Sequence, residues 1–360
     1  LLLICESSKT KNNQTDNDDL YKIYWEDTKM EFSATAGTAG GSLKALFEVR
    51  DGDNLENFKG KVTKADSYSL TVENISIDNI KSLNLPDKDG KITVNNISYS
   101  YDSWEAQVDA QGNIKSVTFN LSKDKAIADP EKTVAEGYLL NAGSAINARG
   151  IPYYMTQLNE FVRNFSEMFN QIESKGQNLN GDTPPTFFEA ITNTAKVYDF
   201  SESEAYSKLP DGQTATINSS SNTYYRMTAA NFSVNKDVMN DVSLFATSTD
   251  YVKTDSCDIV DELKKLQSEK TVYRGDKAES FLETIISNVS VDTEKAETYN
   301  KLYSNLEQTI ANQRTSVSGV DEDEEALNLV KFQYSYNMAS KIISVMNQML
   351  DKLINDTGVA

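Results

Sequence analysis

Carboxylates are the side chains of this chain that could do chemistry, and their densest group is the run of five acids from Asp321 to Glu325. Clustered carboxylates are the ligands that hard cations such as Ca²⁺ prefer. An EF-hand loop, however, alternates its ligands and carries Gly at its sixth and Glu at its twelfth position, and this run does neither. Because the acids stand directly before a segment with helical apolar spacing, we expect them to supply favourable charge to a helix N-terminus.

Two loops have the beginnings of ligand-binding motifs. Residues 87–90 (Asp-Lys-Asp-Gly) start like a calcium loop, but no Glu closes it, so we expect a hairpin turn there. Residues 37–41 (Gly-Thr-Ala-Gly-Gly) are rich in glycine like a phosphate-binding loop, but the Lys-Ser/Thr pair of that loop is missing. We therefore expect a flexible lead-in to a helix.

Composition excludes several classes of active site. The chain has no histidine, which excludes Ser-His and Cys-His nucleophiles and imidazole zinc sites. Cys5 and Cys257 are too few for a four-cysteine metal site. Two carboxylates could hydrolyse a glycosidic bond, but no pair stands out among the 54 acids, so a hydrolase is the least favoured hypothesis. We expect a protein that is not an enzyme and that has no catalytic residue, cofactor or metal.

Charge and hydropathy restrict the partners. The 35 basic against 54 acidic residues give a net charge of −19, which disfavours nucleic acid as a partner. No run reaches the roughly 20 apolar residues of a transmembrane helix, so we expect no membrane insertion. The opening Leu1–Cys5 lacks a basic leader and the chain does not start with Met. We expect a piece whose true N-terminus lies upstream.

The first 150 residues indicate mostly β structure. Residues 1–55 contain a strand candidate at 21–25 and helical spacing at 43–50. Residues 56–148 alternate apolar with polar positions, and turn signals at 87–90 and 111–113 predict hairpins of a compact all-β domain. Its tyrosines could line a binding face, but half-buried strand positions explain them better. These tyrosines are Tyr68, Tyr99 and Tyr101.

From Pro152 the apolar period becomes helical. One row of apolar residues, here called the middle stripe, predicts a helix that ends at Gly176. The middle stripe consists of Tyr154, Leu158, Phe161, Phe165, Met168 and Ile172. Residues 177–235 are rich in small polar types and predict irregular and β segments. Helical signals then return, and Asp292 or Thr293 is expected to cap a new helix that breaks at 316–319. Residues 149–318 are thus predicted to form a helical middle domain.

The most regular apolar pattern is in the predicted helix of residues 319–360. Spacings of four and three define a second row, the C-terminal stripe: Phe332, Tyr336, Ala339, Ile343, Met346, Leu350 and Leu353. A coiled-coil stripe of this kind gains its stability from a partner helix. No equally regular mate is evident, so we expect the mate upstream or on another molecule. The fold class is predicted as α+β multidomain: a helical domain, an inserted all-β domain and a long C-terminal amphipathic helix.

Three stretches resemble the flagellar hook-associated protein 1 family. Residues 316–336 (SVSGVDEDEEALNLVKFQYSY) follow its C-terminal signature at nearly every position, with Glu322 a mild departure. Residues 40–51 (GGSLKALFEVRD) and the helix ending in 175–181 (KGQNLNG) are similar to two further family motifs, although Glu173 stands near where relatives often carry His. In common relatives the helix runs on directly after the Arg-Asp pair, so the resemblance implies that 56–148 is an insertion.

The resemblance implies a structural role in the bacterial flagellum. Family members join hook and filament, so the chain is expected to assemble as a homo-oligomeric ring between the hook protein and hook-associated protein 3. It implies extracellular placement, without a cleaved signal peptide, after export by the flagellar type III pathway with an export chaperone. The C-terminal stripe would then pack axial helices and bind the chaperone, while Arg50 and the middle stripe hold the middle domain. The alternative is a secreted β-rich binding module or adhesin whose ligand binds 56–148.

Overall fold

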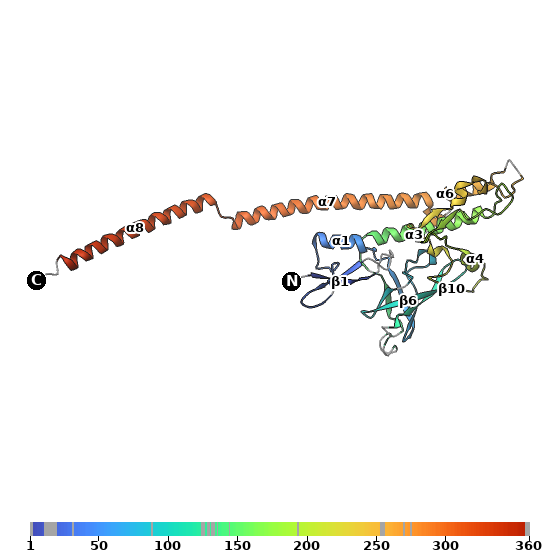
Figure 1. Cartoon of the computed structure of the whole chain (residues 1–360), viewed down its shortest axis with the longest axis horizontal. Helices are drawn as coiled ribbons and strands as arrows, with labels where there is room; N and C mark the ends of the chain where they lie inside the picture. The colour runs from blue at the N-terminus through green and yellow to red at the C-terminus, as the bar shows by residue number, and fades with distance from the viewer. Residues whose placement is uncertain are drawn as a thin grey trace. The chain divides into compact units, whose positions relative to one another are not determined.

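The computed structural model describes residues 3–10, 20–30, 32–87, 89–123, 127, 130, 134, 136–143, 145–192, 194–252, 256–268, 271–273 and 276–356. The chain divides into two compact units, residues 1–285 and residues 286–360. Figure 1 labels the helices and strands. Their mixture supports the predicted α+β class.

The first unit contains a closed antiparallel β-barrel, seen below α3 in Figure 1. Six strands follow each other around the barrel in the order β6, β5, β8, β3, β4 and β7, and β7 pairs with β6 to close it. Their bounds are β3 Phe58–Asp66, β4 Ser69–Glu73, β5 Gly90–Val94, β6 Ile97–Val108, β7 Ile114–Leu121 and β8 Leu139–Ala142. A barrel leaves few strand edges unpaired, which protects such a domain from edge-to-edge association.

The alternating apolar residues fill the barrel. Trp104, Tyr101 and Phe119 are completely buried, and Tyr99 is nearly so, whereas Tyr68 is exposed. The interpretation of tyrosines as strand positions is thus confirmed for Tyr99 and Tyr101. Gly90 lies so close to the Tyr101 ring that a Cβ would come within 2.2 Å of it, so the ring needs a glycine there.

Two hairpin predictions had opposite outcomes. The turn at Gly112, with φ of +77°, joins β6 to β7 as expected. The hairpin at 87–90 is wrong: this loop leads into β5, whose partners are β6 and β8, and not back along β4. The β5–β6 hairpin turns instead at Asn95 and Asn96, both with positive φ, as tight hairpin turns require.

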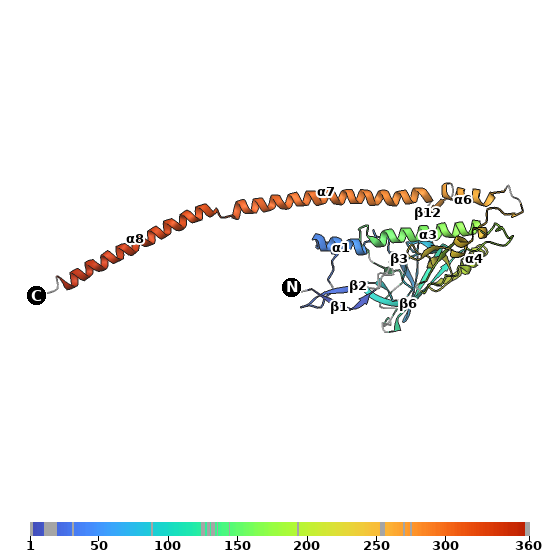
Figure 2. The ribbon, with the colours of Figure 1, turned by 45° about the horizontal axis from the view of Figure 1, so that its top comes forward.

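Helices α1 (Gly41–Asp51) and α3 (Ile151–Glu173) flank the barrel domain in sequence and follow one another end to end in space (Figure 2). The amide of Gly150 donates to the carbonyl of Gly52 at 3.0 Å, and Tyr153 donates to the same oxygen at 3.2 Å. A Cβ on either glycine would lie within 2.4 Å of the carbonyl oxygen of Glu48. Only glycine fits this joint, where the chain leaves for the barrel and returns from it.

The first unit has further, mostly short elements besides these. They are β1 Leu3–Thr10, β2 Leu20–Trp25, η1 Ile80–Ser82, β9 Phe188–Ala190, α4 Ser201–Ser207, β10 Ala215–Asn218, η3 Tyr224–Arg226, β11 Phe232–Val234, α5 Lys236–Asn240, η4 Val242–Leu244, α6 Asp258–Ser268, β12 Thr271–Tyr273 and β13 Asp276–Lys277. Strand β10 pairs with β6, and Tyr206, Ile217 and Tyr225 join the barrel core. The core of the barrel therefore includes side chains from well beyond residue 148.

Helix α7 (Ala278–Ser318) starts in the first unit and continues into the second, which also contains α8 (Glu322–Asn355). The expected helix start at Asp292 or Thr293 is wrong, because α7 runs through both residues. The Thr293 hydroxyl donates to the Val289 carbonyl at 2.7 Å, a bond that a threonine inside a helix can make. The predicted break at 316–319 is confirmed, since α7 ends at Ser318.

Candidate functional site

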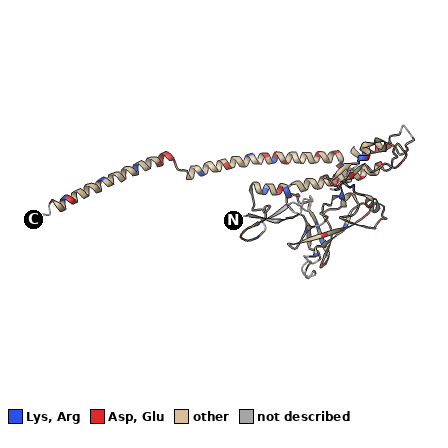
Figure 3. Cartoon of the chain, in the orientation of Figure 1, with Lys and Arg blue, Asp and Glu red and all other residues tan. Residues whose placement is uncertain are grey.

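The acidic run of the sequence caps helix α8. The Asp321 carboxylate accepts from the amides of Asp323 at 3.0 Å and Glu324 at 3.4 Å, and the other acids occupy the first turn. Figure 3 shows these acids at the start of α8. The capping interpretation is therefore confirmed. Among the described residues, no three His, Cys, Asp or Glu side chains come together as metal ligands would.

The C-terminal stripe lies on α8, exposed along its whole length. None of the described residues of this helix is buried, and Phe332 and Tyr336 are 74% and 72% exposed. Ala339, Ile343, Met346, Leu350 and Leu353 are likewise exposed. Soluble proteins rarely leave contiguous apolar patches uncovered unless the patch meets a partner. The helix thus presents an exposed apolar face of coiled-coil spacing.

A second apolar row widens this surface. Met338, Ile342, Val345 and Met349 are exposed and follow each other at the same spacings of four and three. With 3.6 residues per turn, this row lies beside the C-terminal stripe, and together they cover roughly half of the circumference. A face that wide exceeds the narrow stripe of a two-helix coiled coil. The sequence pattern of four and three could have shown the second row.

The middle stripe is covered within the chain. Tyr154, Leu158 and Phe161 pack against Phe281 and Ile285 at the start of α7. Phe161, Phe165, Met168 and Ile172 pack against the apolar side of α6, where Ile259 and Leu266 are buried. The Phe161 and Phe281 rings stack with centroids 5.3 Å apart. Arg50 is placed elsewhere: it pairs with Asp51 at 2.6 Å on α1 and lies over the Phe47 ring.

The opposite face of α3 is polar and also buried. Its centre is Arg163, which is only 2% exposed. The guanidinium donates to the carbonyls of Met227 at 2.8 Å, Lys81 at 2.8 Å and Leu83 at 2.6 Å. It also lies 4.7 Å from the centroid of the Tyr225 ring. Arg163 thus ties α3 to the barrel domain and to η3, a role that the sequence reasoning missed.

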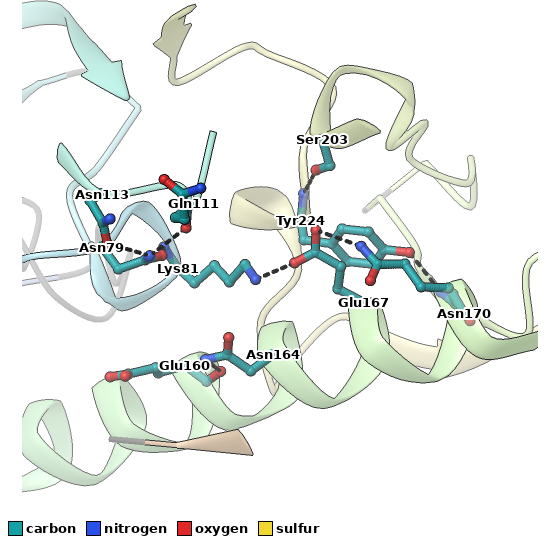
Figure 4. A network of polar contacts seen from close by, with 11 residues as sticks. Asn79, Lys81, Gln111, Asn113, Glu160, Asn164, Glu167, Asn170, Ser203 and Tyr224 are labelled. Carbon is teal, nitrogen blue, oxygen red and sulfur yellow. Dashed lines mark hydrogen bonds and ion pairs between the residues drawn. The ribbon is translucent and has the colours of Figure 1, made fainter. Parts of the chain in front are cut away.

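More polar contacts continue along this face of α3 (Figure 4). Lys81 on η1 reaches Glu167, with 2.5 Å between Nζ and Oε2. The Asn170 amide donates to the Tyr224 hydroxyl at 2.9 Å, and the Tyr224 amide donates to Ser203 Oγ at 3.0 Å. Polar residues opposite an apolar stripe usually indicate a solvent-facing side, so the sequence carries no signal for this second buried face.

Glu173 is the last residue of this polar face, and its carboxyl group is unusual in its burial and its protonation. Its side chain is 2% exposed, and Oε1 accepts from the Ala246 amide at 2.7 Å. Burial raises the pKa of Glu173 to about 7, although the Ala246 amide favours the ionised form. At neutral pH the native carboxyl is therefore about half protonated, whereas in the unfolded chain it is ionised.

None of the described helices offers a stretch both long and apolar enough to cross a lipid bilayer.

Comparisons with known proteins give the functional context. Residues 311–356, which include the end of α7 and all of α8, match the family model of the flagellar basal body rod FlgEFG protein C-terminal region. The chain is 21% identical over 341 residues to flagellar hook-associated protein 1 of Bacillus subtilis (strain 168). The match covers 92% of this chain and 56% of that protein, so the chain spans about half the length of this curated relative. The resemblance to flagellar hook-associated proteins is confirmed.

Proposed function

We propose that this homologue of flagellar hook-associated proteins, a structural component of the bacterial flagellum, joins hook to filament through the apolar face of α8. The observation that most strongly supports this proposal is that the segment matched by the rod-protein family model contains the fully exposed C-terminal stripe. In this proposal the stripe packs against axial helices in a ring of identical subunits. The hook protein and hook-associated protein 3 are its neighbours.

The physical support is the amount of apolar surface on α8. Side chains such as Phe332 and Leu350 contribute on the order of 2 kcal/mol each when they pass from water into an apolar contact. Helices in proteins gain most of their stability from packing of an apolar face, so a partner that covers the stripe also stabilises the helix. Packing and ordering thus occur together when the subunit assembles.

Export is the second part of the proposal. A chain that leaves the cell through the flagellar type III pathway must keep the C-terminal stripe covered beforehand, because an exposed apolar face promotes aggregation. In this proposal an export chaperone covers the stripe before export, and the chain is delivered to the extracellular flagellum. The net charge of −19 favours solubility of the chain before it assembles.

The barrel domain at 56–148 is proposed to be an insertion into a helical axial-type domain. The joint at Gly52 and Gly150 supports this, because the two ends of the barrel domain meet where α1 would otherwise run on into α3. The barrel is filled by side chains such as Trp104 and Phe119. The alternative, an adhesin whose ligand binds this domain, stays a prediction.

Deletion of residues 326–360 tests the proposal. Cells with the deleted chain should form hooks without filaments and lose swimming in soft agar, and the purified chain should no longer bind the chaperone. Circular dichroism and Trp104 fluorescence should show an intact barrel. Normal filaments on cells with this deletion would overturn the proposal.

Point variants sharpen the test without removing the helix. Ile343→Asp with Leu350→Asp places charges on the C-terminal stripe, and both side chains are exposed, so the monomer should remain folded. The matched control, Asn337→Asp with Gln348→Asp, adds the same charge to the opposite face of α8. Filament assembly should fail with the first pair and survive with the second.

A further inference from the structure

A second candidate site is a cleft beside the C-terminal half of α3. Its volume is about 560 Å³, and it opens between α3, the loop at 184–186 and residues 197–203. Four carboxylates line it, those of Glu167, Glu173, Glu189 and Asp199, and the described lining contains no Lys or Arg. Glu167, Asn170 and Tyr224, which are labelled in Figure 4, belong to this lining. The cleft is therefore strongly acidic.

One carboxylate of the cleft has an oxygen without a hydrogen-bond partner. Glu173 Oε1 is satisfied by the Ala246 amide, but Oε2 is buried and has no partner among the described residues. Buried polar atoms in native proteins are nearly always paired, so an orphaned carboxylate oxygen in the lining of a cleft points to a missing donor. The donor that a carboxylate binds most strongly is a cation.

Electrostatics single out two of the four acids. Glu167 is paired with Lys81, and hydrogen bonds from Ser201 lower the pKa of Asp199. The pKa of Glu173 is raised by burial, and that of Glu189 by burial and by the negative charge of Asp237, with Lys236 acting in the opposite sense. The ionised forms of Glu173 and Glu189 are thus the least compensated, and a cationic group beside them would stabilise both as carboxylates.

The remaining lining favours a ligand with an apolar stem. Pro184, Pro185 and Val197 line the same cleft as the acids. Arginine and lysine combine these chemistries, since an aliphatic stem carries a cationic head that donates several hydrogen bonds. We propose that the cleft binds an arginine or lysine side chain of a partner protein, the stem against the prolines and the head at Glu173 and Glu189. This goes beyond the flagellar role and does not depend on it.

Titration of the full chain with capped amino acids tests the proposal. N-acetylarginine amide and N-acetyllysine amide should bind in the millimolar range, as expected for small ligands, and shift NMR signals of residues around the cleft. N-acetylcitrulline amide has nearly the shape of arginine but no charge, and it should bind about tenfold more weakly. Equal binding of arginine and citrulline, or no binding of either cation, would overturn the proposal.

Variants locate the head group. Glu173→Gln with Glu189→Gln should weaken arginine binding by about tenfold or more, because both changes remove charge and keep shape. The matched control is Glu202→Gln on α4, an exposed acid outside the cleft, which should bind as the unaltered chain does. Unchanged affinity of the double variant, verified as folded by circular dichroism, would rule the site out. Spermidine binding more tightly than the capped amino acids would also overturn the assignment, since it would indicate a free polyamine as the ligand.

Discussion

Helices α3 and α8 carry the same sequence pattern and have opposite environments. Both present apolar residues at spacings of four and three, as Tyr154, Leu158 and Phe161 do on α3 and Phe332, Tyr336 and Ala339 do on α8. The middle stripe is covered by α6 and the start of α7, whereas the C-terminal stripe is exposed. The pattern therefore establishes that a helix has an apolar face, and the rest of the chain decides whether that face is core or interface.

The other faces of the two helices explain the difference. On α3 the face opposite the stripe is buried too, and Arg163 and Glu167 connect it to η1 and the barrel. Residues of α8 that lie away from the stripe, such as Lys341, are exposed like the stripe itself. Helix α3 packs on both faces and is therefore part of the core, whereas α8 packs on neither face and is available for assembly.

The largest effect should come from Arg163→Met. This change removes the donors of three hydrogen bonds from a buried cation, and charge-assisted bonds contribute about 1.5–3 kcal/mol each, so we expect a loss of about 4 kcal/mol in unfolding free energy. Urea unfolding followed by Trp104 fluorescence measures it. Arg50→Met is the control, with a loss below about 1 kcal/mol because its ion pair is partly exposed. Equal losses for both would contradict the internal role of α3.

Matched Phe→Ala changes compare a residue that covers the middle stripe with a residue of the C-terminal stripe. Phe281 is 3% exposed and stacks on Phe161, so Phe281→Ala should cost about 3 kcal/mol and speed hydrogen exchange at the start of α7. Phe332→Ala should change the stability of the isolated chain by less than about 0.5 kcal/mol, and should instead weaken chaperone binding and assembly. A large loss of monomer stability from Phe332→Ala would show that the C-terminal stripe is already covered.

Glu173→Gln should reveal the proton held at the end of α3. Because the native pKa of about 7 exceeds the ordinary value of 4.5, stability is greatest at low pH, falls as pH rises between these values and levels off above them. The variant lacks this fall, so above neutral pH it should be more stable than the unaltered chain by about 3 kcal/mol. Urea midpoints from about pH 4.5 to pH 8 provide the measurement. Parallel curves would mean that Glu173 is ionised in the native state.

The smallest effect should come from Asp321→Ala. The Asp321 side chain caps α8, and loss of an N-cap costs about 1 kcal/mol. Asp321→Asn keeps the acceptor and should preserve most of the cap. Hydrogen exchange in the first turns of α8 distinguishes the two variants, and identical exchange would contradict the capping role.

Local patterns in the sequence predicted the elements well. The period of two identified the strands that bury Trp104 and Phe119, and the acids before α8 identified its cap. The wrong predictions also have physical causes. The loop at 87–90 has turn chemistry, but a turn signal does not say which strands pair, and β5 pairs with β6 and β8.

What the sequence could not supply was contact between distant segments. Closure of the barrel requires β7 to pair with β6, and the role of Arg163 depends on carbonyls at positions 81, 83 and 227 that only the fold brings together. The acidic cleft likewise combines α3 with residues near 184–203. Side chains such as Arg163 and Glu173 look like ordinary helical surface residues until both faces of α3 are known to be buried.

The glycine joint has a consequence for the order of folding. Bringing Gly52 to Gly150 through an unfolded segment of roughly 100 residues would cost about 4 kcal/mol of chain entropy. A folded barrel already holds its first and last strands, β3 and β8, side by side, so the same closure then costs little. We therefore expect the barrel to form first and α1 to dock onto α3 afterwards, because the folded barrel holds the neighbouring ends of the two helices close together.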